Sequence, residues 1–283
     1  MDMSEGKYRI AGVQMDVSLG QIENNLENLI VRWRQAAADG AVLTAFPECA
    51  LSGYCFESLA EARQFGLTTE SKVFRTLSDI ARELNSHVVF GFLEPDAERL
   101  YNSAACIGPN GVVARYRKVH LPFLGVDRFT THGAELSVFE VPGLDLRVGM
   151  NICYDCSFPE AARVLMLRGA DLLVLPTNWP PTSGLTADVI PNARALENNI
   201  YVMTVNRVGE ERGFTFIGKS KICNPGGGTL AFANHAKEET LYAEIEPGWA
   251  RRKHLVNIPG KHEVHRVRDR QPDSYGPLCE PTG

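Results

Sequence analysis

The chain has 283 residues, of which 44% are hydrophobic and 22% are charged. These are ordinary values for a globular protein, and they exclude disorder, a collagen-like chain and a coiled coil as descriptions of the whole sequence. The net charge of -5 comes without a basic stretch that could follow a phosphate backbone, so we expect no nucleic-acid partner.

The sequence also gives an expectation about compartment. No apolar run reaches the roughly eighteen residues that a membrane-spanning helix needs, and residues 1–7 lack the apolar stretch of a signal peptide. The cysteines are odd in number and scattered, at positions 49, 55, 106, 153, 156, 223 and 279. This pattern fits reduced thiols better than a disulfide framework. We therefore expect a cytoplasmic protein with no membrane association.

The first half of the sequence alternates apolar runs of strand and helix type. Residues 22–37 place their apolar side chains on one helical face, because these side chains recur at intervals of three or four. The expected elements are a strand at 8–15, a helix at 22–37, a buried strand at 41–46, a helix at 73–84, and strands at 87–93, 101–107 and 112–117.

The second half repeats this rhythm. The expected elements are a strand at 144–152, a helix from about Pro159, a strand at 171–176, a helix around 186–198, and strands at 200–206, 215–222, 228–233 and 240–245. Such alternation predicts α/β layers in one domain, residues 1–250. The basic, proline-rich segment 251–283 is expected to be an arm that packs on a partner subunit. Arg194 and Glu197 are expected to form a buried ion pair.

Cys153 lies where the strand at 144–152 meets the following helix. Ser157 and Glu160 have the spacing of a capping box at the start of that helix. A cysteine near the positive end of a helix dipole has a stabilised thiolate and can serve as a nucleophile. The alternative is a buried cysteine that acts only as a small apolar side chain, which is the commoner role.

Two charged residues also stand at predicted strand ends. Glu48 follows the strand at 41–46, and Lys118 follows the strand at 112–117. Ligand-binding groups of α/β sheets gather at strand ends, so these side chains and Cys153 could act as base, oxyanion-stabilising cation and nucleophile. Taken separately, Glu48 could cap a helix and Lys118 could be solvated.

Three segments resemble the signature blocks of the nitrilase superfamily of carbon–nitrogen hydrolases. They are Phe46-Pro47-Glu48 with Leu51-Ser52-Gly53-Tyr54, Tyr116-Arg117-Lys118-Val119-His120-Leu121, and Asn151-Ile152-Cys153-Tyr154-Asp155 with Phe158-Pro159-Glu160. The resemblance continues, in the same order, through Asn178-Trp179-Pro180, Arg194-Ala195-Leu196-Glu197-Asn198 and Val205-Asn206-Arg207-Val208-Gly209. It implies an α-β-β-α sandwich that pairs into an α-β-β-α-α-β-β-α homodimer. It also implies a thiol hydrolase without metal or cofactor, with Glu48, Lys118 and Cys153 as catalytic residues.

One position departs from the family pattern. Many members have a second glutamate between the lysine block and the cysteine, where this sequence has Asp127. We expect Asp127 to take that role on a shorter arm or to leave it to water. Tyr54, Asn178 and Trp179 are expected to line the substrate pocket, and the backbone N–H of Tyr154 is expected to face the oxyanion.

The resemblance favours hydrolysis of a small amide through a thioester acyl-enzyme, with release of ammonia or an amine. True nitrilases often have Trp-Glu after the cysteine, whereas Tyr154-Asp155 is more similar to the amidase and carbamoylase branches. An N-carbamoyl amine or amino acid is therefore the alternative substrate, and a nitrile is less favoured. A non-catalytic scaffold is also less favoured, because it has no need for the glutamate, the lysine and the cysteine together.

Two other motifs match known sites only formally. Residues 213–220 fit the G-x-x-x-x-G-K-[ST] phosphate loop, but their variable positions favour a strand, and a turn follows at 224–228 where the loop needs a helix. His262 and His265, with His254 upstream, lack the H-E-x-x-H order of a zinc site. We expect these histidines to lie on a solvated arm.

Overall fold

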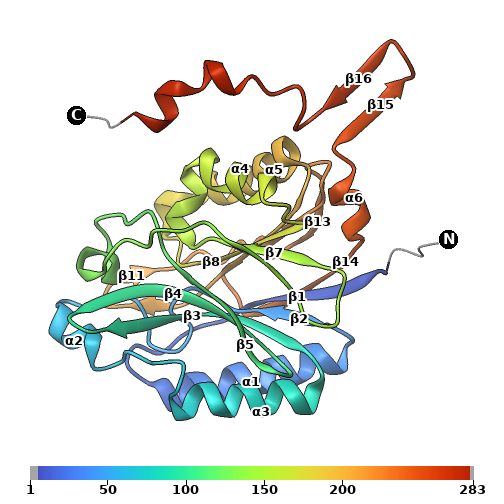
Figure 1. The fold of residues 1–283 in the computed structure, drawn as a ribbon. Coiled ribbons are helices and arrows are strands. Elements are labelled where there is room, and N and C mark those ends of the chain that lie inside the picture. The colour runs from blue at the N-terminus through green and yellow to red at the C-terminus, as the bar shows by residue number, and fades with distance from the viewer. Residues whose placement is uncertain (1–5, 281–283) are drawn as a thin grey trace.

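The computed structural model describes residues 6–280. Residues 1–5, on which the expected absence of a signal peptide partly rests, and residues 281–283 lie outside the described part. The chain forms four layers in the order helix, sheet, sheet, helix (Figure 1). The predicted α-β-β-α fold is therefore confirmed. None of the described helices has the length and hydropathy of a membrane-spanning segment.

The first sheet has six strands in the order β14-β1-β2-β3-β4-β5. In chain order they are β1 (Tyr8–Gln14), β2 (Leu43–Ala45), β3 (His87–Asp96), β4 (Arg99–Gly108), β5 (Gly111–Arg117) and β14 (Glu239–Ile245). β1, β2 and β3 are parallel, whereas β3, β4 and β5 form an antiparallel meander. Because β5 again runs in the direction of β3, β2 and β5 end at the same edge of the sheet.

The second sheet has the order β13-β12-β9-β8-β7-β6. In chain order its strands are β6 (Val138–Glu140), β7 (Arg147–Met150), β8 (Leu172–Thr177), β9 (Tyr201–Asn206), β12 (Lys221–Cys223) and β13 (Thr229–Phe232). β7, β8 and β9 are parallel, so this sheet repeats the parallel centre of the first. The edge strand β6 is absent from the predicted elements, because three half-exposed residues give no recognisable alternation.

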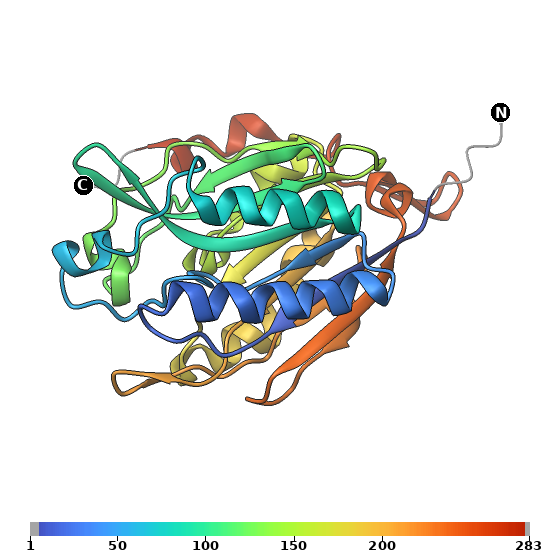
Figure 2. The ribbon, with the colours of Figure 1, turned by 90° about the horizontal axis from the view of Figure 1, so that it is seen from below.

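The described residues form six α-helices, and four of them cover the outer faces of the two sheets. The six are α1 (Ile22–Ala38), α2 (Leu59–Arg63), α3 (Lys72–Leu84), α4 (Pro159–Leu167), α5 (Gly184–Asn198) and α6 (Pro247–Arg251). α1 and α3 lie side by side on the first sheet (Figure 2). Leu29 and Trp33 of α1 and Phe74 of α3 are buried against Phe90 of β3, as the helical spacing of apolar residues predicts. α4 and α5 cover the second sheet in the same way.

The two sheets face each other across the largest hydrophobic core. Ile10 and Val89 of the first sheet and Val148 and Val174 of the second are fully buried in it. Burying such an aliphatic side chain stabilises the fold by roughly 1.5–3 kcal/mol. The core therefore fixes one sheet against the other, and it brings the ends of their parallel strands to one place.

The predicted continuous strand at 215–222 is wrong. Two short strands, β10 (Glu210–Glu211) and β11 (Phe214–Thr215), form a hairpin, and β12 begins only at Lys221. Gly218 and Lys219 between them have positive φ angles of 65° and 59°. Extended backbone cannot pass through two left-handed residues, so the chain turns there. The segment leads into β12, where a phosphate loop would lead into a helix.

The predicted capping box at α4 is also wrong. The residue that precedes the helix is Phe158, and its side chain accepts no hydrogen bond from the helix. Ser157 is instead the last residue of a 3₁₀ turn, Cys153–Ser157. The helix begins with Pro159, whose fixed φ suits the first helical position and whose missing N–H needs no cap.

The C-terminal segment leaves the sandwich after α6. Its strands β15 (His254–Ile258) and β16 (His262–His265) pair only with each other, and they project beyond the layers in Figure 1. His254 contacts Glu263 at 2.8 Å between Nε2 and Oε2. Within residues 6–280, no group of three or more side chains is arranged to hold a metal ion.

Candidate active site

The carboxyl ends of four strands carry the site residues that the sequence predicts. Glu48 follows β2 and Lys118 follows β5 in the first sheet, while Cys153 follows β7 and Asn178 follows β8 in the second. Parallel strands of α/β proteins present functional groups at this end. Because the sheets are packed face to face, the four positions meet between them.

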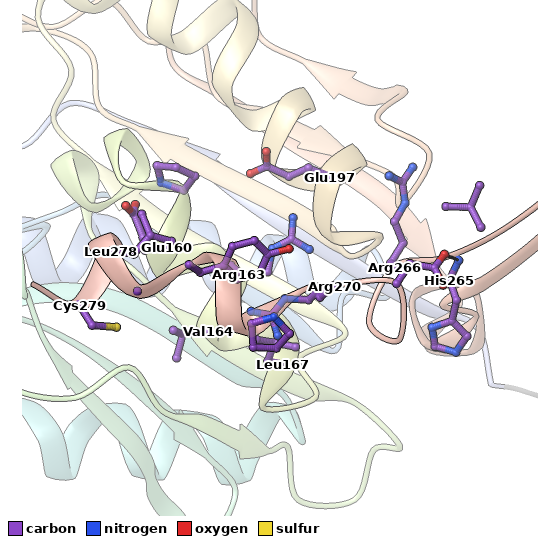
Figure 3. A pocket seen from close by; sticks show the side chains of 16 residues that line it. Glu160, Arg163, Val164, Leu167, Glu197, His265, Arg266, Arg270, Leu278 and Cys279 are labelled. Atoms are coloured by element: carbon purple, nitrogen blue, oxygen red, sulfur yellow. Dashed lines mark hydrogen bonds between the residues drawn. The ribbon is translucent and has the colours of Figure 1, made fainter.

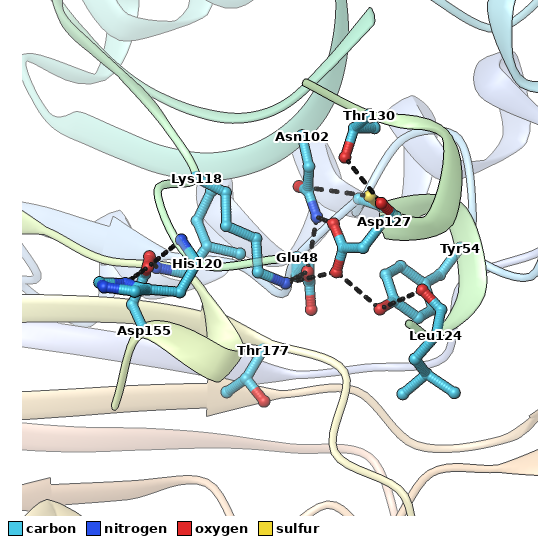
Figure 4. A network of polar contacts seen from close by, with 12 residues as sticks. Glu48, Tyr54, Asn102, Lys118, His120, Leu124, Asp127, Thr130, Asp155 and Thr177 are labelled. Atoms are coloured by element: carbon cyan, nitrogen blue, oxygen red, sulfur yellow. Dashed lines mark hydrogen bonds and ion pairs between the residues drawn. The ribbon is translucent and has the colours of Figure 1, made fainter. Parts of the chain in front are cut away.

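Lys118 lies at the centre of a buried ionic network (Figure 4). Its Nζ donates to Glu48 Oε1 at 2.7 Å and to Asp127 Oδ2 at 2.6 Å. Asn102 Nδ2 donates to the same two carboxylates, at 2.7 Å to Glu48 Oε1 and 2.8 Å to Asp127 Oδ1. The Tyr54 hydroxyl donates to Asp127 Oδ2 at 2.8 Å. One cation and two neutral donors thus hold both carboxylates in fixed positions.

The structure therefore places Tyr54 and Asp127 in the network rather than on the surface. Asp127 lies in a 3₁₀ turn, Gly125–Phe129, that follows the Lys118 loop. Gly125 has a φ of 49°, and a Cβ there would lie 2.1 Å from the Tyr54 ring. Glycine is needed because any side chain would displace that tyrosine from Asp127.

Charge and burial shift the pKa values of the network in opposite directions. Burial, with a contribution from Asp127, raises the pKa of Glu48, and Lys118 opposes this shift. Burial lowers the pKa of Lys118, but Asp127 and Glu48 more than offset it and hold the pKa well above its usual value. Lys118 is therefore charged throughout the physiological pH range, and Glu48 holds a proton more readily than an exposed glutamate.

Cys153 has strained backbone geometry. Its φ is 45°, in the left-handed region that residues other than glycine rarely adopt. Such strain costs of order 1–3 kcal/mol and is concentrated at functional sites. The Cys153 side chain is buried beside Glu48 and Lys118, both of which influence its pKa.

The predicted stabilisation of a resting Cys153 thiolate by a helix dipole is wrong. Burial and the Glu48 carboxylate raise the pKa of this thiol well above its usual value, against the opposing effects of Lys118 and the Asn178 backbone N–H. The helix α4 begins only at Pro159, after the 3₁₀ turn, and so its N-terminus is not at the sulfur. The thiol is protonated at rest, and it needs a base to react.

Asp155 is a buried residue of the site that sequence reasoning missed. Its Oδ1 accepts from the backbone N–H of His120 at 3.0 Å, and its Oδ2 accepts from Tyr116 OH at 2.7 Å and from the Ile152 N–H at 2.8 Å. These contacts tie the end of β5 to the turn that carries Cys153. Its position two residues after the cysteine is the signal that could have identified it.

Asn102 was missed for a different reason. It lies within the apolar run of β4, where the sequence predicts only a buried strand. A fully buried amide in such a run needs hydrogen-bond partners, and this requirement could have marked it as functional.

The ion pair of Arg194 and Glu197 is present, with 3.0 Å between Nη1 and Oε1. Arg194 also donates from Nε and Nη2 to the carbonyl of Cys156, at 3.1 and 3.0 Å. Arg194 is buried, whereas the Glu197 side chain is partly exposed. The arginine therefore fixes the turn that begins at Cys153, which the sequence did not predict.

The remaining predicted residues lie around the cysteine. Tyr154 is 38% exposed and packs edge-on against Phe158. Trp179 is buried, and its backbone N–H donates to Asn206 Oδ1 at 2.8 Å. Asn178 is buried as well, with its backbone N–H directed at the Cys153 sulfur.

Comparison with known proteins identifies the class. The model of the carbon-nitrogen hydrolase family matches residues 9–253, and the chain belongs to this family. It is 36% identical over 254 residues to a protein named nitrilase from Pyrococcus abyssi, covering 88% of this chain and 94% of the relative. It is 31% identical over 280 residues to omega-amidase NIT2 from Homo sapiens, covering 95% of this chain and 96% of the relative.

The fold comparison agrees. The solved structure of a carbon-nitrogen hydrolase from Helicobacter pylori G27 matches with a TM-score of 0.85 at 23% identity, covering 98% of this chain and 99% of that one. The family match and the two relatives confirm the resemblance to the nitrilase superfamily. The protein is an enzyme of the amidase-like carbon–nitrogen hydrolases.

Proposed function

We propose that the enzyme hydrolyses a small linear amide through a thioester on Cys153. The observation that carries the proposal is the buried pair of Glu48 and Lys118 beside a cysteine with a positive φ angle. Glu48 has one carboxyl oxygen, Oε2, without a hydrogen-bond partner, and this oxygen is available to accept the thiol proton. A carboxyl group with a raised pKa suits proton transfer in both directions.

The reaction then runs in two halves. Glu48 takes the thiol proton, the sulfur attacks the amide carbon, and Lys118 and the backbone N–H of Tyr154 hold the resulting oxyanion. Such preorganised donors usually make the largest contribution to catalysis. Glu48 gives its proton to the nitrogen, which leaves as ammonia or an amine while the thioester remains. Glu48 then activates a water molecule, which hydrolyses the thioester to a carboxylic acid and restores the thiol.

The names of the relatives support an amide but do not agree on one substrate. One is named an omega-amidase and another a nitrilase. An N-carbamoyl compound remains the alternative, because its carbamoyl end presents the same carbonyl and –NH₂ to the site. A screen for ammonia release over amides, N-carbamoyl compounds and nitriles tests the proposal. We expect the highest kcat/KM on an amide, and release of ammonia from none of the three classes would contradict the proposed function.

We assign Asp127 an orienting role, in which it holds Lys118 without transferring a proton. Asp127→Asn replaces an acceptor by an amide whose NH₂ group faces the ammonium, and it should cost about 2–5 kcal/mol of transition-state stabilisation. Asp127→Glu should retain much of the activity, because the carboxylate survives on a longer arm. Steady-state kinetics of both variants measure this. Wild-type kcat, KM and Tm in Asp127→Asn would show that Asp127 has no part in the reaction.

We further propose that segment 251–283 is an arm that packs on a partner subunit in a homodimer, outside the hydrolase domain 1–250. Val256 and Ile258 of β15 are 48% and 53% exposed, so the arm presents apolar surface that a partner subunit could bury. A cavity of about 760 Å³ also separates the end of the segment from the outer face of α4 (Figure 3).

The location of the protein in the cytoplasm, which the sequence analysis expects, stays a prediction.

Truncation after residue 250 tests the arm. Light scattering of the intact chain should give the mass of a dimer or a larger homo-oligomer. The truncated chain should give smaller particles, because its arm no longer buries apolar surface on a partner. A truncated chain that stays dimeric would remove the arm from the interface, without removing the dimer itself.

A further inference from the structure

Two residues of the site have buried polar atoms without a hydrogen-bond partner. In the part of the chain that the structure describes, seven buried side-chain nitrogen or oxygen atoms lack a partner, and three of them are Glu48 Oε2, Asn178 Oδ1 and Asn178 Nδ2. Buried polar groups of folded proteins are almost always hydrogen-bonded, because leaving one unpaired is unfavourable. The reaction already uses Glu48 Oε2. The Asn178 side chain has no such assignment.

Asn178 is held beside the nucleophile. Its backbone N–H is directed at the Cys153 sulfur, and its side chain is 1% exposed. The next residue, Trp179, donates its N–H to Asn206 Oδ1 at 2.8 Å and accepts from Asn206 Nδ2 at 3.4 Å. Asn206 therefore holds both the N–H and the carbonyl of Trp179, and the Asn178 amide is carried on a rigid segment.

Glu48 faces the same region. In Figure 4 its second carboxyl oxygen points away from the bonded pair of Lys118 and Asp127, on the side where Thr177 lies. Thr177 is the residue that immediately precedes Asn178. Glu48 and the Asn178 backbone both act on the Cys153 thiol, so both residues lie next to the nucleophile.

We infer that Asn178 Oδ1 accepts one N–H of the scissile amide, so that Asn178 selects substrates with an unsubstituted –NH₂ group. This rests on the proposed function. An unsubstituted amide has two donors on its nitrogen and an oxygen that accepts from Lys118 and Tyr154. Glu48 Oε2 accepts a hydrogen bond from the first N–H, and once it holds the thiol proton it gives that proton to the nitrogen as the C–N bond breaks. Asn178 Oδ1 takes the second N–H, and ammonia is the leaving group.

The same contact rejects N-substituted amides. An N-methyl amide places a carbon where the second N–H belongs, and Asn178 Oδ1 then stays buried without a donor. Sites built to pair a polar group discriminate strongly against analogues that leave it unpaired. We expect the wild-type enzyme to have a kcat/KM at least about tenfold higher for an unsubstituted amide than for the N-methyl amide of the same acid.

The test measures, in variants of Asn178, the ratio of kcat/KM for the unsubstituted amide to kcat/KM for the N-methyl amide. Asn178→Leu keeps the approximate shape and removes the acceptor, and it should lower kcat/KM for the unsubstituted amide about tenfold while the N-methyl amide changes less than about twofold. If the leucine variant folds poorly, Asn178→Ala replaces it in the test. This variant also removes the acceptor, and it should bring the ratio toward one. Trp179→Phe is the matched control, because a packing change next to the same site should affect both amides equally.

The outcomes separate the inference from the proposed function. Asn178 variants that lose activity on both amides by the same factor, including complete loss, would overturn the selecting role of Asn178 while amide hydrolysis by the wild type stands. A wild-type enzyme that hydrolyses neither amide would overturn both. A ratio that approaches one in Asn178→Leu and is unchanged in Trp179→Phe supports the inference.

Discussion

Cys153→Ala is expected to abolish turnover of every substrate that the wild-type enzyme hydrolyses, with kcat lower by about 10⁴-fold or more. In the proposed mechanism the sulfur forms the bond to the acyl group, and alanine has no atom that can form it. Lys118 and the oxyanion site remain in the variant, but without the attacking sulfur no oxyanion forms for them to stabilise. Steady-state kinetics with a sensitive ammonia assay measure the loss.

Cys156→Ala provides the matched control. Cys156 is a buried free cysteine on the same 3₁₀ turn, and the site uses only its backbone carbonyl, through Arg194. The control should retain most of the wild-type kcat, because alanine leaves that carbonyl in place. Activity of Cys153→Ala within tenfold of the wild type would remove the thiol from the mechanism.

Lys118→Ala has the second largest expected effect, a fall in kcat of at least about 10²–10³. The variant loses the ammonium to which we assign stabilisation of the oxyanion, and it leaves Glu48 and Asp127 buried together without a cation. Lys118→Arg should not restore activity, because a planar guanidinium cannot reproduce the two contacts of Nζ at 2.6 and 2.7 Å.

Loss of a buried charge partner also destabilises the fold, by roughly 3–5 kcal/mol, so kinetics must be measured on folded protein. Lys221→Met is the control for this effect. Lys221 of β12 is a second buried lysine, which donates to the backbone carbonyl of Asp188 and to Asn192 Oδ1 on α5 and makes no contact with the network. Lys221→Met should lower Tm with little change in kcat. Equal kcat values for Lys118→Ala and the wild type would place the oxyanion site elsewhere.

The sequence was sufficient for the central strands of both sheets, for the long helices and for the charged residues at strand ends. Glu48 and Lys118 could be found because each is a charged residue at the point where a predicted strand stops. Asp127 could be proposed only through the family resemblance, since its neighbourhood in the sequence is an ordinary polar loop. Its distance of 2.6 Å from Lys118 depends on the path of the whole loop after β5.

Other features depend on contacts that no local pattern records. Asn102 is separated by more than fifty residues from Glu48, its partner in the network, and only the packing of β4 beside β3 brings them together. The raised pKa of Cys153 arises from burial and from Glu48, whereas the local sequence suggested a helix dipole. The turn at Gly218 and Lys219 follows from two positive φ angles, although the residues around it favour a strand.

The central claim is that an acyl group is carried on the Cys153 sulfur during turnover. Intact-mass measurement during hydrolysis of a slowly processed amide tests it most directly. The wild-type enzyme should gain the mass of one acyl group, located by peptide mapping at Cys153, and Cys153→Ala should gain none. Turnover of the same amide with no adduct under these conditions, or with an adduct on a residue other than Cys153, would contradict the thioester mechanism.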